Sequence, residues 1–283
     1  MKEKKRFIYN CIGLPVEILI RSILLIVIFI SCFPLKLEAA EVEPPGSLKT
    51  LGPLIQATSF QDEYTGNVRY GGACTKVIER MDTAAAFENI QSCIVKINVD
   101  GYYGSGIIWD MEEDYIIIAS NKHLLEKWSE EGYLTLEGQL RIPAEIVKIS
   151  DEYDLGFIKA EISTVGYEEA VLLNEVRKDA AAYHNLQAGD VVFNAGILEK
   201  TETLENMVSI WYEGTVASPW WYIEEFDSYM LYAFCYAKPG MSGGGMFDGY
   251  GNFVGMVSGG TGGDESIAIP VSVMIDEYEA IRR

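Results

Sequence analysis

Histidine, cysteine and positive charge are scarce in this chain of 283 residues. It has two histidines, His123 and His184, and its cysteines lack the spacing of metal ligands, so we expect no metal site and no other cofactor. Its 22 Lys and Arg residues stand against 42 Asp and Glu residues, which gives a formal charge of −20. Because nucleic-acid binding requires cationic side chains that neutralise phosphates, we also expect no nucleic-acid partner.

The sequence also lacks an apolar run of the ~20 residues that cross a bilayer as a helix. Residues 22–35 are uncharged and mostly apolar, but they number only fourteen. Basic residues precede them, namely Lys2, Lys4, Lys5, Arg6 and Arg21. This pattern is typical of a signal peptide, here with a small-residue cleavage site after Ala39 or Ala40. Without cleavage, residues 1–40 would anchor the protein. Both alternatives predict an extracytoplasmic body that touches the membrane only through this segment.

Few cysteines remain once residues 1–40 are removed. Cys74, Cys93 and Cys235 are then left, and the formal charge becomes −23. An odd number of cysteines allows at most one internal disulfide, which excludes a disulfide-stabilised scaffold and leaves the pairing of these three open. Stability must therefore come from a packed core, for which the hydrophobic content of 49% is sufficient.

Composition divides the rest of the chain into two parts. Residues 41–80 are rich in Pro, Gly, Ser and Thr without sustained periodicity, and we interpret them as a linker or pro-like segment. We interpret residues 81–283 as one domain. Within it, residues 82–91 predict a helix, because three consecutive alanines favour helix and Asp82 can cap it.

Short β-type runs recur from Ser92 onward, separated by turns rich in Gly and Asp. We expect strands at residues 93–99, 105–109, 115–120, 144–149, 155–160, 191–195, 207–216, 230–237, 253–258 and 267–270. Many short strands without a βαβ rhythm favour an all-β fold. The length of this region suits two small barrels.

The most specific feature of the sequence is residues 239–246, which read Pro-Gly-Met-Ser-Gly-Gly-Gly-Met. A serine among glycines can project its hydroxyl from a tight turn whose N–H groups converge, as an oxyanion hole requires. Gly240 and Ser242 are the natural N–H donors. A plain glycine-rich turn fits the same residues, and the motif alone does not decide between the two. The serine elbow of α/β-hydrolases is formally present, but it needs a following helix, and strands flank Ser242 on both sides.

A nucleophilic serine needs a base, and the base needs a carboxylate that orients it. His123 follows a β-run directly, whereas His184 lies far from any strand end and is interpreted as a surface residue. Asp154 lies at the start of an apolar strand; Asp151 competes with it but sits in the turn. The order His123, Asp154, Ser242 is the order of the chymotrypsin-like triad.

These three residues lie within six ordered motifs. The motifs are a helix that runs into a strand at 87–97, Gly-Ser-Gly-Ile-Ile at 104–108, Ser-Asn-Lys-His-Leu at 120–124, Asp-Leu-Gly-Phe-Ile-Lys at 154–159, Pro-Gly-Met-Ser-Gly-Gly-Gly at 239–245, and Gly-Asn-Phe-Val-Gly-Met at 251–256 with Ala-Ile-Pro-Val at 268–271. Together they resemble the trypsin-like serine proteases of the chymotrypsin (PA) clan, and among these most the bacterial HtrA/Deg protease domain. The resemblance covers roughly residues 84–275.

The resemblance implies two six-stranded antiparallel β-barrels and hydrolysis of peptide bonds through an acyl-enzyme. His123, Asp154 and Ser242 would form the triad, and the N–H groups of Gly240 and Ser242 would form the oxyanion hole. The pocket for the residue before the scissile bond would be lined by Tyr236, Ala237, Lys238, Val257, Ser258, Gly259 and Gly260. This set contains no acid, so we expect an apolar or small residue of a polypeptide substrate there, and the negative body disfavours acidic substrates. The oligomeric state stays open.

Two departures from the family pattern bear on these expectations. Met241 stands where the family has Asn or Asp, and Gly245 stands where it has Pro. Met241 brings no polar side chain to the oxyanion loop and cannot pair with a new N-terminus, so we expect no activation of that kind. The chain ends twelve residues after Val271, so the resemblance does not extend to a PDZ domain.

Two other functions compete with proteolysis. One is a catalytically silent binding or scaffold module at the cell surface that uses the same fold, since function resides in the site rather than in the fold. The other is a serine esterase, which would need a helix after Ser242, where residues 253–258 predict a strand.

Overall fold

The computed structural model describes residues 75–76, 78–99, 101–136, 141–165, 170, 172–197, 209–260 and 264–282. The predicted signal or anchor segment, 1–40, and nearly all of the predicted linker, 41–80, lie outside the described residues. Within the parts of the chain that are described, no helix has the length and apolar character needed to cross a membrane.

The helix predicted at residues 82–91 is confirmed as α2, Thr83–Ile90. Asp82 caps it, since its Oδ1 accepts the Ala85 N–H at 3.1 Å and thereby satisfies a donor that the first turn leaves free. Phe87 stacks on Trp211 at 5.8 Å between ring centroids. The helix therefore packs against the C-terminal barrel before the chain enters the N-terminal sheet.

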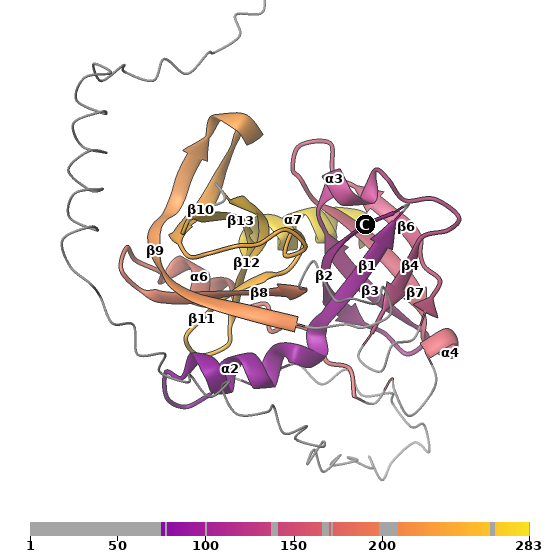
Figure 1. The fold of residues 1–283 in the computed structure, drawn as a ribbon, viewed down its shortest axis with the longest axis horizontal. Coiled ribbons are helices and arrows are strands. Elements are labelled where there is room, and N and C mark those ends of the chain that lie inside the picture. Colours follow the sequence, from indigo (N-terminus) through magenta and orange to yellow (C-terminus); the bar gives the residue numbers. More distant parts are fainter. Residues whose placement is uncertain are drawn as a thin grey trace, which may run out of the picture. The chain divides into compact units, whose positions relative to one another are not determined.

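The N-terminal half forms one antiparallel sheet of seven strands in the order β5-β4-β1-β2-β3-β7-β6 (Figure 1). A 3₁₀ helix, η1 (Gln91–Cys93), leads into β1 (Ile94–Val99), β2 (Tyr102–Met111), β3 (Tyr115–Ser120), β4 (Tyr133–Thr135), β5 (Arg141–Ile142), β6 (Glu145–Ile149) and β7 (Gly156–Glu161). Two short helices, α3 (Lys122–Leu125) and α4 (Ile162–Val165), follow β3 and β7. Every residue of β1 is buried, the polar Lys96 and Asn98 included.

The C-terminal half forms a closed barrel of six strands in the order β10-β13-β12-β11-β8-β9. The strands are β8 (Val191–Ile197), β9 (Ser209–Ile223), β10 (Ser228–Phe234), β11 (Gly245–Asp248), β12 (Phe253–Gly260) and β13 (Ser266–Pro270). Helix α6 (Ala180–His184) precedes this barrel, and α7 (Val271–Arg282) follows it. Three phenylalanine rings fill the interior: Phe247 lies 5.4 Å from Phe193 and 5.5 Å from Phe253 between ring centroids.

The predicted all-β fold of chymotrypsin type with two antiparallel halves is confirmed, and a strand is present at each of the ten predicted places. The C-terminal half is a closed six-stranded barrel, whereas the N-terminal half is a seven-stranded sheet. Five of the ten predicted strands lie in the first sheet, and the short strands β4 and β5, which were not predicted, bring it to seven rather than the expected six. The sequence also did not predict β11, α6 or α7. β11 begins at Gly245, the last of the three glycines that dominate the pattern at residues 243–245.

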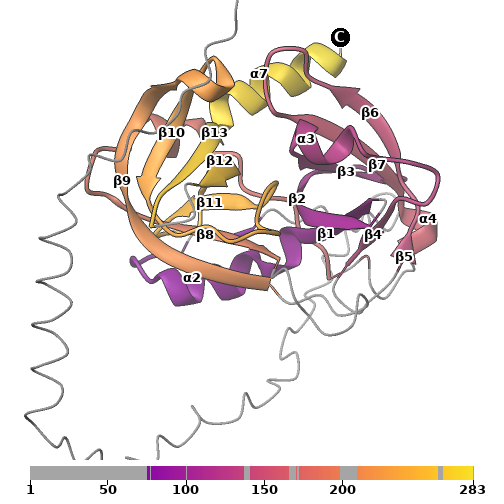
Figure 2. The same cartoon turned by 45° about the horizontal axis from the view of Figure 1, so that its top comes forward.

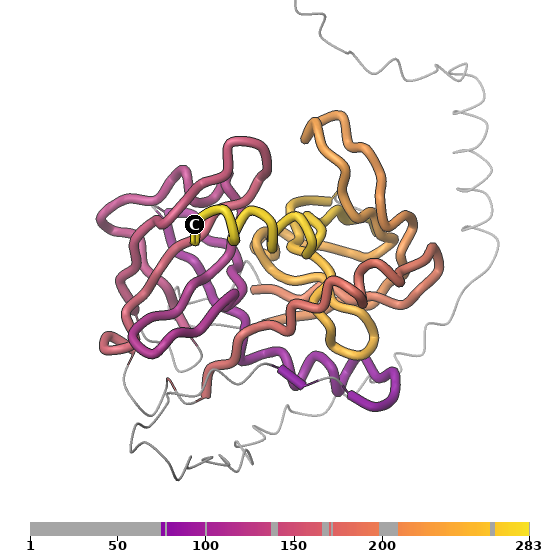
Figure 3. Tube along the Cα trace, turned by 180° about the vertical axis from the view of Figure 1, so that it is seen from behind, coloured from indigo at the N-terminus to yellow at the C-terminus, as the bar shows by residue number. Residues whose placement is uncertain are grey.

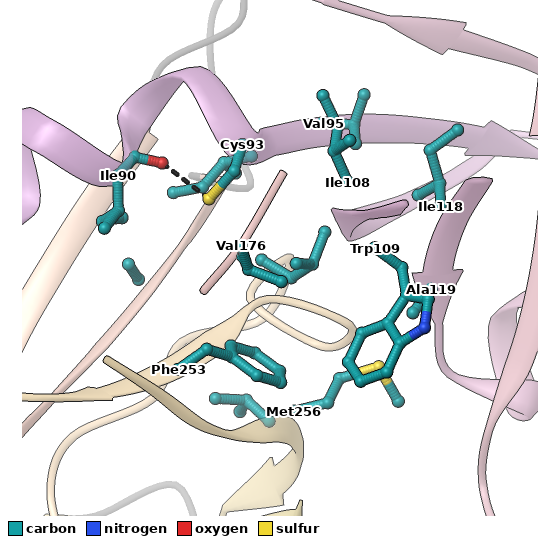
Figure 4. Close-up of a cluster of buried hydrophobic side chains, with 14 of the residues drawn as sticks. Ile90, Cys93, Val95, Ile108, Trp109, Ile118, Ala119, Val176, Phe253 and Met256 are labelled. Atoms are coloured by element: carbon teal, nitrogen blue, oxygen red, sulfur yellow. Dashed lines mark hydrogen bonds between the residues drawn. The ribbon is translucent and has the colours of Figure 1, made fainter. Parts of the chain in front are cut away.

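A single core joins the two halves. Trp109 of β2 lies 6.1 Å from Phe253 of β12 and 6.1 Å from Tyr278 of α7 between ring centroids. Figure 4 shows Trp109 and Phe253 in one cluster with Cys93, Val176 and Met256. Figures 2 and 3 show α7 running from the C-terminal barrel across to the N-terminal sheet. The relative position of the two halves is therefore set by packed side chains.

The β9–β10 hairpin extends beyond its barrel (Figure 1). Its strands are joined by a 3₁₀ helix, η2 (Glu224–Phe226), and Tyr222 pairs with Tyr229 across them. Trp220 stacks face to face on Tyr229, with 5.2 Å between centroids and 6° between planes. These cross-strand aromatic pairs stiffen a hairpin that its barrel supports only at the base.

Candidate active site

His123 is positioned by the end of β3. The strand ends at Ser120, the chain turns at the buried Asn121, and His123 lies in the short helix α3. Leu124 and Leu125 are buried, which fixes the orientation of this turn and leaves the His123 side chain 49% exposed. The sequence therefore holds this histidine at a rigid strand end with its ring at the surface.

Asp154 meets His123 because β3 and β7 pair antiparallel. Ser120 is the register partner of Gly156, so the residues after β3 and those before β7 lie at the same edge of the sheet. The Asp154 Oδ2 atom lies 2.8 Å from His123 Nδ1, and Oδ1 accepts the backbone N–H of His123 at 2.9 Å. The Asp154 side chain is only 11% exposed. A carboxylate in this place favours the tautomer with hydrogen on Nδ1 and leaves Nε2 free to accept a proton.

The structure excludes the competing aspartate as a partner of His123. Asp151 is 96% exposed, and its one ion pair among the described residues is a 3.9 Å contact with Lys148. The other histidine also lies elsewhere: His184 lines a different cavity together with Trp220 and Ser272.

Asn121 is a site residue that the sequence analysis missed. Its side chain is fully buried, and its amide donates to the Asp154 carbonyl at 3.0 Å and to the Ser258 hydroxyl at 2.9 Å. It thus ties the aspartate loop of the first sheet to β12 of the second barrel. The one sequence signal for this role is an Asn between the end of an apolar β-run and the candidate base two positions later.

The Ser242 loop has the conformation that its glycines permit. Gly240 and Gly243 adopt φ values of +96° and +84°, which disfavour side chains. A Cβ atom at Gly243 would also lie 2.1 Å from the Ser105 carbonyl oxygen, so glycine is required there on two grounds. The Lys238 carbonyl accepts the Met241 N–H at 3.0 Å, which closes the turn just before the serine.

Ser242 lies beside the His123 turn. Its carbonyl accepts the Ser105 N–H at 2.8 Å, and a Cβ atom at Gly104 would contact both this carbonyl, at 3.1 Å, and Leu124, at 2.6 Å. The Ser242 side chain is partly exposed. Ser242 and His123 both belong to the described part of the chain, and within it no hydrogen bond joins the Ser242 hydroxyl to the His123 ring. The structure thus brings the three predicted residues to one place, without a hydrogen bond from the serine to the ring.

The two predicted oxyanion donors are free. Within the described residues, neither the Gly240 N–H nor the Ser242 N–H donates a hydrogen bond. The Gly240 carbonyl, in contrast, accepts the Ser105 hydroxyl at 2.6 Å, and the same hydroxyl accepts the Ile197 N–H at 2.8 Å. Ser105 therefore connects β2, β8 and the serine loop, a role that the sequence did not predict.

Met241 fills the place of the polar residue that precedes the serine in the family. Its side chain is fully buried, and its sulfur accepts the Lys238 N–H at 3.3 Å. Apolar burial and a weak sulfur acceptor thus replace the polar side chain that the family has at this position.

The residues predicted to line the substrate pocket come together only in part. A Cβ atom at Gly260 would lie 3.6 Å from Ala237, so the two predicted segments meet there. Val257 and Ser258 are buried, and the Ser258 hydroxyl is engaged by Asn121. The remaining predicted lining residues, Tyr236, Lys238 and Gly259, are half-buried.

Lys238 faces two aromatic rings. Its Nζ lies 5.3 Å from the Tyr212 centroid and 5.8 Å from the Tyr236 centroid, and a hydrogen bond with Tyr212 raises the pKa of the lysine above its usual value. The neighbouring Cys235 is a buried free thiol, and burial raises its pKa to about 12, so it stays neutral and is no nucleophile. Cys93 is also a buried free thiol, and Cys74 lies outside the described residues.

In the described parts of the chain, no group of three or more His, Cys, Asp or Glu side chains is placed to hold a metal ion. Comparison with protein families gives one match, a trypsin-like peptidase domain over residues 104–256. This range contains all three residues of the candidate triad. Comparison with curated protein sequences gives no match.

Proposed function

Because this chain belongs to the trypsin-like peptidase family, we propose that it is an exported serine endopeptidase in which His123, Asp154 and Ser242 form the catalytic triad. The observation that carries the proposal is the pair of contacts from Asp154 to the Nδ1 atom and the backbone N–H of His123. A surface histidine without a catalytic role has no need of a nearly buried carboxylate that fixes both its ring and its backbone.

In the proposed mechanism His123 Nε2 takes the proton of the Ser242 hydroxyl while its oxygen attacks the carbonyl carbon of the scissile peptide bond. Asp154 stabilises the imidazolium that forms. The N–H groups of Gly240 and Ser242 donate to the oxyanion of the tetrahedral intermediate. His123 then gives its proton to the leaving amine, and water hydrolyses the acyl-enzyme by the same steps.

Two features of the free chain fit this mechanism. The candidate oxyanion donors have no partner among the described residues, so a substrate oxygen can take their hydrogen bonds without displacing one. The Ser242 turn lies beside the His123 turn, and catalytic hydrogen bonds of this kind often form fully only with substrate bound.

Export is the second part of the proposal, and it rests on the basic and apolar pattern of residues 1–40. A protease with this leader would act on polypeptides outside the cytoplasm, released after cleavage of the leader or held at the membrane without it. Fractionation of cells that express the full chain, followed by N-terminal sequencing, distinguishes retention in the cytoplasm, release and anchoring.

Hydrolysis of unfolded casein by the purified full-length protein tests the catalytic part. We expect Ser242→Ala and His123→Ala to abolish cleavage and Asp154→Asn to lower kcat by about 10⁴-fold, because the amide would hold the wrong imidazole tautomer. His184→Ala is the matched control and should retain wild-type activity.

A folded wild-type protein that cleaves no polypeptide would contradict the proposal, and so would cleavage whose rate does not change with these substitutions. It would instead favour a silent binding module with the same fold.

A further inference from the structure

An open cavity of about 460 Å³ lies beside the proposed base, outside the predicted substrate pocket. It is lined by Lys122, His123, Glu126, Glu152, Tyr153, Asp154 and Phe226. Six of these residues come from α3 and from the loop before β7, and Phe226 comes from the tip of the β9–β10 hairpin. In Figure 1 this hairpin and α3 both rise on the upper side of the molecule.

Phe226 is the apolar wall of this cavity, and the hairpin holds it in place. It ends η2, directly before Asp227, which has a left-handed backbone with φ of +47°. The Tyr222 hydroxyl donates to the Asp227 carboxylate, which fixes the turn from the opposite strand. A Cβ atom at Gly259 would lie 4.0 Å from the Phe226 ring, so the same ring borders both this cavity and the predicted pocket at β12.

The charges around the cavity are mostly negative. Glu126 and Glu152 are exposed, and within the described residues neither carboxylate has an ion-pair partner. Asp154 faces the cavity as well, but it is paired with His123. Lys122 is the only fixed cation of the lining, and its ammonium donates to the Ser150 carbonyl at 2.9 Å. An aromatic wall and two unpaired carboxylates together suit a side chain with an apolar stem and a cationic head.

An extended peptide fixes which of its residues can reach this cavity. Successive side chains of an extended chain point to opposite sides. When one side chain enters the predicted pocket at β12, its neighbour therefore points away from that pocket, and the cavity beside His123 is the neighbouring hollow that Phe226 also borders. We propose that this cavity is a specificity site for lysine or arginine at the second residue before the scissile bond. The inference rests on the proposed protease function, and it identifies basic polypeptides as the substrate class.

Three pairs of four-residue peptide coumarylamides test this site with the full-length protein. Within a pair, one peptide has Ala and the other has Leu directly before the scissile bond. The three pairs differ in the residue before that one, which is lysine, norleucine or glutamate. Norleucine retains the stem of lysine without its charge. We expect kcat/KM to be about fivefold higher for lysine than for norleucine, since two exposed carboxylates supply modest attraction, and lowest for glutamate. The lysine advantage should shrink as salt screens these charges.

Substitutions assign the preference to named residues. Glu126→Gln combined with Glu152→Gln should bring the ratio of lysine to norleucine to about one. Glu130→Gln is the matched control, because it removes an exposed charge outside the cavity and should leave the ratio unchanged. Phe226→Ala should lower kcat/KM about tenfold for lysine and norleucine alike, since both stems lose the same apolar wall.

Equal rates for lysine and norleucine in the wild type would overturn this inference, as would a lysine preference that survives the double glutamate substitution. Labelling of Ser242 by a fluorophosphonate without cleavage of any lysine peptide would overturn it while leaving the proposed function intact. Failure of both labelling and cleavage would overturn the proposed function, and this inference with it.

Discussion

The hydroxyl of Ser105 illustrates how much one buried side chain determines in this site. It accepts the Ile197 N–H and donates to the Gly240 carbonyl, so it fixes the Gly240–Met241 peptide, which adjoins the unpaired Gly240 N–H across one Cα atom. The residue has no exposed surface, so water cannot take over either bond. Ser105 is a positioning residue for the proposed oxyanion hole rather than a residue that touches substrate.

Ser105→Ala should lower kcat about tenfold with KM within about twofold, because it frees a peptide whose orientation matters mainly in the transition state. Steady-state kinetics on a coumarylamide peptide measure the two constants separately. Ser120→Ala is the matched control, since it removes an equally buried hydroxyl that bonds the Ser105 carbonyl and does not contact Gly240. A rise in KM at constant kcat in Ser105→Ala would contradict the positioning role.

Among the elements, those with a local signal could be predicted from the sequence. Helix α2 has its capping aspartate and alanines, and strands such as β3 have an apolar run bounded by turns. Strands β4 and β5 have three and two residues, so their sequences are too short to show a period. They exist because neighbouring strands supply hydrogen bonds, which is information that a local pattern does not contain.

The residues of the candidate site also fall into those that could be predicted from the sequence and those that could not. His123, Asp154 and Ser242 could be predicted because each sits in a motif with its own turn or strand end. The roles of Ser105, Asn121 and Phe226 could not, because each depends on contacts between segments that are distant in the chain. Ser105 and Gly240, for example, are separated by 135 positions.

The cap of α2 allows a test at the scale of an element. Asp82→Ala should lower the free energy of unfolding by about 1 kcal/mol, because the Ala85 N–H loses its acceptor at a helix end. Urea unfolding followed by tryptophan fluorescence measures this. Glu88→Ala lies on the exposed side of the same helix and should change stability by less than about 0.5 kcal/mol. Equal effects of the two substitutions would show that the cap contributes nothing.

At the scale of the whole molecule, contacts across the two halves make the site possible. Asn121 bonds Ser258 across the halves, and the Tyr278 hydroxyl of α7 donates to Asp110 of β2 at 2.9 Å. Arg282 of α7 reaches Asp110 and Glu112 as well. Because His123 belongs to one half and Ser242 to the other, any loosening of these contacts would separate the proposed base from the proposed nucleophile.

The segment that connects the two halves also contains a carboxylate that is mostly removed from water, Glu175. Glu175 accepts the Met111 N–H at 3.2 Å and pairs with Lys178 at 3.6 Å. Burial raises the pKa of this carboxyl above its usual value, the nearby Asp110 adds to the rise, and Lys178 opposes it. A carboxyl whose pKa is raised by folding stabilises the fold when protonated, and this contribution is lost as pH rises from the ordinary carboxyl pKa through the raised one.

Glu175→Gln should therefore raise the free energy of unfolding at pH 7, since the amide stays neutral and can still accept the Met111 N–H. The difference from wild type should disappear near pH 4, where both side chains are uncharged. Urea unfolding at the two pH values measures this, with Glu130→Gln as the exposed control. A destabilised variant at pH 7 would mean that the Lys178 pair outweighs the cost of burial.

The most direct test of the account is the site of covalent modification by a fluorophosphonate probe. The full-length protein is treated with the probe and digested, and the modified peptide is identified by mass spectrometry. The account predicts one adduct, on Ser242, lost in Ser242→Ala and strongly slowed in His123→Ala but not in His184→Ala. A folded protein that acquires no adduct, or acquires it on another residue, would contradict the central claim that Ser242 is a nucleophile activated by His123.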